Sequence, residues 1–192
     1  MSNLFDSEFD EHQAVTAATR AQLRVPFEQI LKACVDASRS GNKIFFFGNG
    51  GSAADAQHLA TELTIRYKKD RAPIAAIALT TDSSALTAAG NDLGFEQIFA
   101  RQLEALGRKG DVAIGITTSG KSPNVLAAFA TAKKIGVTSV VFTGGTGGQA
   151  AQLADLKLVV PSTTTARIQE MHITLGQMLC AGLEIELGLV AP

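Results

Sequence analysis

Two segments rich in glycine and hydroxyl side chains have the composition of phosphate-binding loops. Residues 48–52 read Gly-Asn-Gly-Gly-Ser, and residues 117–122 read Thr-Thr-Ser-Gly-Lys-Ser. Glycines let the backbone approach a ligand, a helix N-terminus offers unpaired N–H groups to an anion, and hydroxyls donate to phosphate oxygens. Either segment alone is more typical of an ordinary turn with a helix cap. Because both follow short apolar runs and precede helical patterns, the pair favours a phosphate site.

A second group of side chains could bind a metal or move a proton. His58 and Glu62 are four residues apart in a helical pattern, which places them on one face. Such a pair can bind zinc or act as a base and its partner, although most pairs of this kind are surface contacts. Gln169 and His172, three residues apart, are also neighbours on a helix face. A capped, solvated helix start explains this second segment equally well.

Two nucleotide-binding patterns match the sequence, but their surroundings do not. Gly48-x-Gly50-x-x-Ala53 fits the dinucleotide fingerprint, which requires an acidic residue at the end of the next strand. Residues 66–71 are instead a charged stretch without strand character. Residues 115–122 fit the P-loop pattern in full, yet Gly115 lies inside an apolar run and no later strand ends in an aspartate for magnesium. Nucleotide hydrolysis is therefore a minor alternative.

Alternating strands and helices must position these loops. Runs that predict strands fall at residues 43–47, 74–79, 112–117, 139–143 and 156–160. Helical patterns fall at 8–22, from Pro26 to about 40, from the first glycine loop to about Tyr67, in short segments up to Leu106, and at 123–135 and 165–187. Uninterrupted apolar strands between helices indicate an α/β fold whose parallel sheet is covered on both faces. Ligands bind at the carboxyl ends of such strands, which is where the two loops lie.

Composition excludes several classes of function. The chain has 192 residues, 46% of them hydrophobic, and a formal net charge of −1 without a basic block. This size suits one domain, and the charge argues against nucleic-acid binding. The sequence contains no apolar run long enough to span a bilayer, and its acidic N-terminus is unlike a secretory signal. Cys34 and Cys180 lie in apolar helical patterns and are expected to be core thiols rather than a disulfide, as in a cytoplasmic protein.

Five motifs together resemble those of the bacterial phosphoheptose isomerases, which are sugar-isomerase (SIS) domain proteins. The motifs are GNGGSAADAQH at 48–58, ALTTD at 78–82, GND at 90–92, TSGKSPN at 118–124 and ARIQEMH at 166–172. The resemblance covers almost the whole chain. It implies a single SIS domain over residues 1–192, a three-layer, doubly wound, flavodoxin-like sandwich with a five-stranded parallel sheet. Helices at about 8–40 would pack in the oligomer, and residues 43–192 would carry the sheet and loops.

The resemblance also implies an activity. Members of this family isomerise D-sedoheptulose 7-phosphate to D-glycero-D-manno-heptose 7-phosphate through an enediol, for the ADP-heptose of lipopolysaccharide and other surface polysaccharides. They are homotetramers with active sites at subunit interfaces. The residues that would bind substrate are Asn49, Gly50, Gly51, Ser52, Glu62, Asn91, Asp92, Thr117, Thr118, Ser119, Ser122 and Gln169. Zinc would be held by His58, Glu62, Gln169 and Gln177, and Glu62 would also be the catalytic base.

One position departs from the family. Eight residues after Gln169, most members have a histidine that binds zinc and exchanges a proton, whereas this chain has Gln177. A glutamine can offer an oxygen to a metal but does not exchange a proton near pH 7. SIS-domain regulators that bind the replication initiator also lack this histidine, and they lack an acidic residue where this chain has Glu62. Because Glu62 is retained, the sequence favours the isomerase, with the non-catalytic regulator as the alternative.

Overall fold

Five short apolar strands form one parallel sheet. The structure is a computed structural model that describes residues 3–191. The strands are β1 (Ile44–Gly48), β2 (Ala76–Ala78), β3 (Val112–Ile116), β4 (Thr138–Gly144) and β5 (Leu156–Val160). Their order across the sheet is β2-β1-β3-β4-β5, and every neighbouring pair is parallel. This is the flavodoxin-like order, and the predicted α/β class is confirmed.

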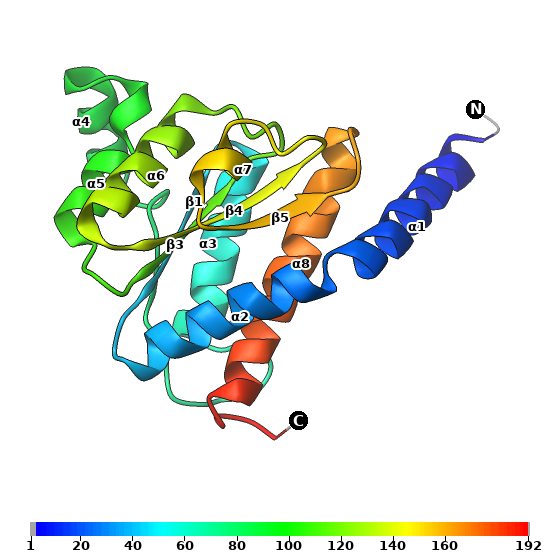
Figure 1. Ribbon diagram of the computed structural model, residues 1–192, viewed down its shortest axis with the longest axis horizontal. Coiled ribbons are helices and arrows are strands. Elements are labelled where there is room, and N and C mark those ends of the chain that lie inside the picture. The colour runs from blue at the N-terminus through cyan, green and yellow to red at the C-terminus, as the bar shows by residue number, and fades with distance from the viewer. Residues whose placement is uncertain (1–2, 192) are drawn as a thin grey trace.

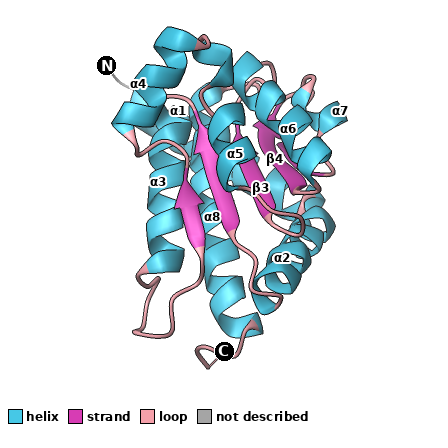
Figure 2. Ribbon diagram, turned by 90° about the vertical axis from the view of Figure 1, so that its left-hand side faces the viewer, coloured by secondary structure: helices cyan, strands magenta, loops and turns pink. Residues whose placement is uncertain are grey.

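Helices cover both faces of the sheet (Figures 1 and 2). They are α1 (Leu4–Gln22), α2 (Arg24–Arg39), α3 (Gly51–Thr64), α4 (Ser83–Asp92), the 3₁₀ turn η1 (Phe95–Gln97), α5 (Ala100–Leu106), α6 (Pro123–Ile135), α7 (Ala150–Leu153) and α8 (Thr165–Glu186). One face packs on α2, α3 and α8, and the other packs on the layer from α4 to α7. The predicted three-layer sandwich is therefore confirmed.

Alternation along β1 shows why the strand patterns are uniformly apolar. Ile44 and Phe46 face the layer of α2, α3 and α8, whereas Phe45 and Phe47 face the opposite layer. All four side chains are fully buried. Because both faces are covered, successive residues of a strand all contribute to a core, and no polar residue alternates with them.

Several boundaries differ from those that the sequence predicts. Helix α1 begins at Leu4 and α2 at Arg24, so Pro26 lies within the first turn of α2. Strand β2 is only three residues long, and α3 ends at Thr64 rather than near Tyr67. The four-residue helix α7 was not predicted, because a single turn is too short to show a 3.6-residue period.

Both cysteines are core thiols, as predicted. Cys34 and Cys180 are free and buried between α2 and α8 in the same core. Burial raises the pKa of the Cys34 thiol to about 12, so the thiol stays protonated. Among residues 3–191, no helix is both long enough and apolar enough to cross a membrane.

Candidate active site

The two predicted phosphate loops meet at the carboxyl edge of the sheet. They follow β1 and β3, which are adjacent strands with Gly48 opposite Ile116. The strands are added to one side of β1 and then, from β3 onward, to its other side, and a ligand usually binds at such a switch between adjacent strands. The structure thus brings residues 48–52 and 117–122 together, although about 65 residues separate them along the chain.

A pair of amides joins the two loops. Asn49 Nδ2 donates to Asn124 Oδ1 at 2.9 Å, and Asn124 Nδ2 donates back to Asn49 Oδ1 at 2.8 Å. Asn124 is only 1% exposed and also accepts from the backbone N–H of Val125. The prediction included Asn49 but missed Asn124, whose only signal is a polar amide in the first turn after the hydroxyl loop. The pair fixes the spacing between the two loops.

The first loop depends on two glycines for different reasons. Gly50 caps α3 with φ of 58°, a left-handed conformation that favours glycine. Gly51 leaves room for another side chain, since a Cβ there would lie 2.5 Å from Gln169 Nε2. The amide of Gln169 is therefore brought to the glycine loop, while the side chain of Ser52 is buried beside it.

The hydroxyl loop is held in shape by internal hydrogen bonds and by a third loop. The hydroxyls of Thr117 and Ser122 are 3.0 Å apart, and Ser119 Oγ accepts from the N–H of Lys121 at 3.3 Å. Gly120, with φ of 65°, packs so closely on residues 147–148 that any Cβ would collide with their backbone. Its carbonyl accepts from the N–H of Ala150 at 2.9 Å. Thr118 is half-buried and Ser119 is exposed, so hydroxyls remain accessible to a ligand.

His58, Glu62 and Gln177 form a second cluster. His58 Nε2 lies 2.9 Å from Glu62 Oε1 and 3.4 Å from Gln177 Nε2. The His58 side chain is 48% exposed, whereas that of Glu62 is 19% exposed. The helical spacing therefore predicted the His58–Glu62 contact correctly, and the tertiary fold adds Gln177 from α8. A carboxylate beside an imidazole can accept a proton or help to hold a metal.

Helices α3 and α8 lie side by side and run in the same direction (Figure 1). Gln169 lies against Gly51, and further along the pair Gly176 meets Leu59, where a Cβ on Gly176 would be 2.5 Å from Leu59 Cδ1. Gly51 precedes His58 by seven residues, which is about 10 Å along a helix. Gln169 thus lies near the phosphate loop, and no hydrogen bond between residues 3–191 joins it to the His58 cluster.

His172 does not belong to either cluster. It is fully buried, and its Nε2–H donates to the Thr143 carbonyl at 3.1 Å. Its Nδ1 has no hydrogen-bond partner among the described residues. Burial lowers the pKa of His172 to about 4, so the imidazole is neutral at pH 7. Gln169 and His172 are three residues apart on α8, as predicted, but His172 turns into the core, and the alternative of a solvated helix start is wrong for it.

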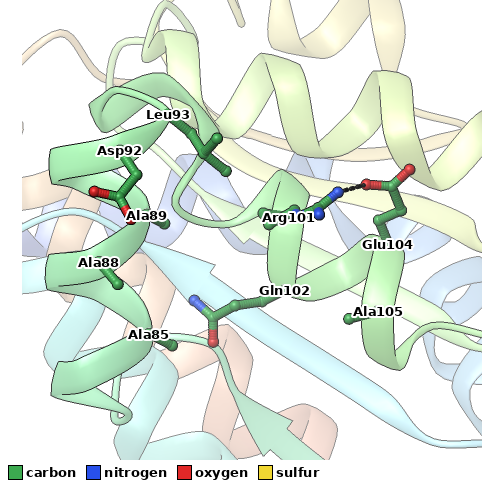
Figure 3. Close-up of a pocket in the computed structure, with 9 residues that line it drawn as sticks. All are labelled: Ala85, Ala88, Ala89, Asp92, Leu93, Arg101, Gln102, Glu104 and Ala105. Carbon is green, nitrogen blue, oxygen red and sulfur yellow. Dashed lines mark hydrogen bonds and ion pairs between the residues drawn. The ribbon is translucent and has the colours of Figure 1, made fainter.

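Asn91 and Asp92 are the last two residues of α4. Asn91 Nδ2 donates to Asp92 Oδ1 at 2.7 Å, and both residues are exposed. Asp92 borders a groove of about 540 Å³ between α4 and α5, whose lining combines four alanines and Leu93 with the polar residues Asp92, Arg101, Gln102 and Glu104 (Figure 3). Within the described part of one chain, no hydrogen bond connects them to residues 48–52 or 117–122.

Asp55 is a further polar residue near the cluster that the prediction did not include. It lies one turn before His58 on α3 and is half-buried. Burial raises the pKa of Asp55 above its ordinary value, and the nearby His58 partly offsets this effect. Its signal in the sequence is the three-residue spacing from His58, which places the two on neighbouring positions of one face.

Comparison with known proteins finds a matching domain family and several proteins of similar sequence. The SIS domain family matches residues 9–144. The phosphoheptose isomerase of Paramagnetospirillum magneticum is 57% identical over 183 residues, covering 95% of each chain. That of Aquifex aeolicus is 60% identical over 148 residues, covering 77% of this chain and 78% of its own.

Solved structures lead to the same group. A phosphoheptose isomerase from Neisseria gonorrhoeae superposes with a TM-score of 0.89 at 42% identity, covering 94% of this chain and 96% of its own. One from Francisella tularensis has a TM-score of 0.92 at 37% identity, covering 95% and 98% respectively. At these identities and coverages the likeness extends to the whole fold.

Proposed function

The chain belongs to the phosphoheptose isomerases, a group of SIS-domain proteins, and we propose that it interconverts D-sedoheptulose 7-phosphate and D-glycero-D-manno-heptose 7-phosphate. The observation that carries the proposal is that two loops suited to phosphate meet at the start of α3, and that the same helix carries the carboxylate–imidazole pair of Glu62 and His58. The first feature suits the phosphate of a sugar, and the second suits proton transfer at its carbonyl end.

The loops would hold the phosphate, and hydroxyl donors would provide most of its contacts. Thr117, Thr118, Ser119 and Ser122 line the hydroxyl loop, and Asn49, Gly50, Gly51 and Ser52 line the glycine loop. Hydrogen bonds to a charged group contribute about 1.5–3 kcal/mol each. Gln169 lies against Gly51 of the glycine loop, where its amide suits the hydroxyls of the sugar chain.

Substitution of the loop hydroxyls provides the first prediction. Ser119→Ala and Ser122→Ala should each weaken substrate binding by about 1–3 kcal/mol, because each removes a hydrogen bond to a charged group. Steady-state kinetics should show this as a raised KM, and circular dichroism should show an unchanged fold. Ser162→Ala, in the loop before α8, is the matched control. Wild-type KM values in both loop variants would contradict the assignment.

Glu62 is the proposed base. Its carboxylate would take a proton from C1 of the ketose, forming an enediol, and would return a proton to C2. The hydroxyl proton must also move from one oxygen to the other, and the neutral Gln177 amide cannot carry it. Solvent can carry this proton, since the side chain of His58, which lies beside Gln177, is 48% exposed.

Zinc is the proposed cofactor, and the donor set of this chain fits it weakly. His58 and Glu62 would be its strong ligands, and the amide oxygen of Gln177 would be a weaker third. Gln169, which lies against Gly51, would have to turn away from the glycine loop to complete the set. Among residues 3–191 no three His, Cys, Asp or Glu side chains cluster, so at least one ligand must be an amide or water. When bound, zinc would polarise the substrate carbonyl.

Restoring the family histidine should improve both metal retention and rate. Gln177→His places a second imidazole beside His58 and adds a group that exchanges protons near pH 7. We expect turnover to rise by about 10-fold, the low end of an acid–base contribution. Zinc content after dialysis should rise with it. His172→Ala should leave the turnover number of the folded fraction unchanged, because His172 does not face the site. No gain in the first variant, with collapse in the second, would contradict this assignment.

We further propose that the protein acts in the cytoplasm as a homotetramer with active sites at subunit interfaces. Two observations support the interfaces. Asn91 and Asp92 are exposed and, among residues 3–191, make no hydrogen bond to the loops of their own chain, so they could serve the site of a neighbour. Helix α1 also extends beyond the sheet and exposes Phe5 and Phe9, whose rings are 4.8 Å apart (Figure 1).

The alternative is a non-catalytic regulator that binds the replication initiator, and the observation that favours it is Gln177. Turnover of sedoheptulose 7-phosphate and the metal content of the purified protein decide between the two. The isomerase proposal requires turnover, which dialysis against a chelator should reduce. An inactive protein that binds the initiator would support the regulator.

A further inference from the structure

A buried ion pair joins Arg71, the last residue of the charged stretch at 66–71 beyond the end of α3, to Glu184 of α8. Arg71 Nε donates to Glu184 Oε1 at 2.8 Å, and the two side chains are 1% and 2% exposed. Glu184 also accepts from the backbone N–H of Tyr67 at 3.1 Å. A run of this composition is ordinarily solvated, so the burial of one of its cations calls for a specific role.

Arg71 binds the carbonyls that the helix itself leaves unpaired. Its Nη2 donates to the Glu62 carbonyl at 2.6 Å, and its Nη1 donates to the Leu63 carbonyl at 2.8 Å. The last four carbonyls of a helix have no intrahelical partner, and the final turn tends to fray. Because α3 ends at Thr64, Glu62 lies in that final turn.

The same guanidinium connects this turn to α8. Glu184 is seven residues after Gln177, which is about two turns along the same face of α8. The backbone of Glu62 is thus joined through Arg71 to the helix that carries Gln177. The close contact of Gly176 with Leu59 holds the middle of the two helices together, and the ion pair holds their ends.

We infer that Arg71 and Glu184, here called the latch, are positioning residues that hold the carboxylate of Glu62 in register with Gln177. The inference rests on the proposed function, because it assigns the latch to the chemistry of Glu62. Neither latch residue would contact the substrate. Loss of the latch should therefore lower kcat and leave KM nearly unchanged, since the phosphate loops lie at the opposite end of α3.

The test must separate positioning from stability. Glu184→Gln removes one charge of the buried pair. Arg71→Met combined with Glu184→Leu replaces the pair by apolar groups, a change that often preserves or increases stability. The apolar variant still leaves the Glu62 carbonyl without Arg71. Asp111→Asn is the matched control, because it removes the charge of another buried carboxylate, which pairs with the partly buried Lys43 at 2.7 Å, at the amino ends of the strands.

In Glu184→Gln and in the apolar double variant we expect kcat to fall by about 10-fold or more, as for a misplaced catalytic group, with KM within about twofold. Competition with a chromophoric chelator should show zinc binding weakened by about 10-fold, as for loss of a supporting contact. Asp111→Asn should change neither quantity.

Wild-type kcat in a folded apolar double variant would overturn the latch, and so would an equal loss in Asp111→Asn. Failure of both latch variants to fold would show that the pair acts on stability and would also overturn it. A wild-type protein without turnover would instead overturn the proposed function, while zinc affinity would still report on the latch. A protein with neither turnover nor zinc binding would overturn both.

Discussion

Glu62→Gln should lower the turnover of sedoheptulose 7-phosphate by about 10²–10⁴-fold, the usual size of a general-base contribution. Glutamine has nearly the same shape as glutamate and can still accept a hydrogen bond from His58, which lies 2.9 Å away. It cannot take a proton from carbon. Steady-state rates at saturating substrate measure the effect directly, because they separate the chemical step from substrate binding.

The expected loss should appear in kcat with KM little changed, because the phosphate loops are untouched. Glu28→Gln is the matched control, since Glu28 also pairs with a residue four positions away, Arg24, but on the exposed surface of α2. That substitution should leave the rate at the wild-type value. If Glu62→Gln kept wild-type turnover, Glu62 would have no part in the chemistry, whatever its position beside His58.

Acidification should destabilise the protein through His172. The pKa of this buried imidazole is lowered to about 4 from an ordinary value of 6.5. Between these values the unfolded chain binds a proton that the native protein does not bind. Stability is therefore fully present above pH 6.5 and is lost as the pH falls toward 4, by about 3 kcal/mol from this one residue. Urea unfolding at pH 7 and at pH 4 measures the loss.

Other groups also titrate over this range, so the comparison needs a variant that lacks the imidazole. His172→Gln keeps a side-chain N–H that can donate to the Thr143 carbonyl but does not titrate. Its stability should depend less steeply on pH than that of the wild type, with the difference confined to the window between pH 4 and 6.5. Parallel pH profiles for the two proteins would mean that His172 is not buried in its neutral form.

Much of the site could be predicted from local patterns. Glycine and hydroxyl residues at strand ends indicated the two loops, and the spacing of His58 and Glu62 indicated their contact. The sequence also showed directly that Gln177 stands where most members of the family have a histidine. These features are local because a helix or a strand end brings together residues that are near neighbours in sequence.

Contacts between distant residues could not be predicted in the same way. Asn49 meets Asn124, Gly51 makes room for Gln169, and Arg71 is buried against Glu184, each across 75 residues or more. The orientation of the His172 side chain could not be predicted either. The helical period places it near Gln169, but it turns toward Thr143 in the core. Periodicity and turn composition act over a few residues, so local patterns sufficed to predict the strands, the loops and the paired acid–base residues on α3. Which helices lie side by side and which polar groups are buried could be known only from the folded molecule, because both depend on strand order and on packing between layers, to which the whole chain contributes.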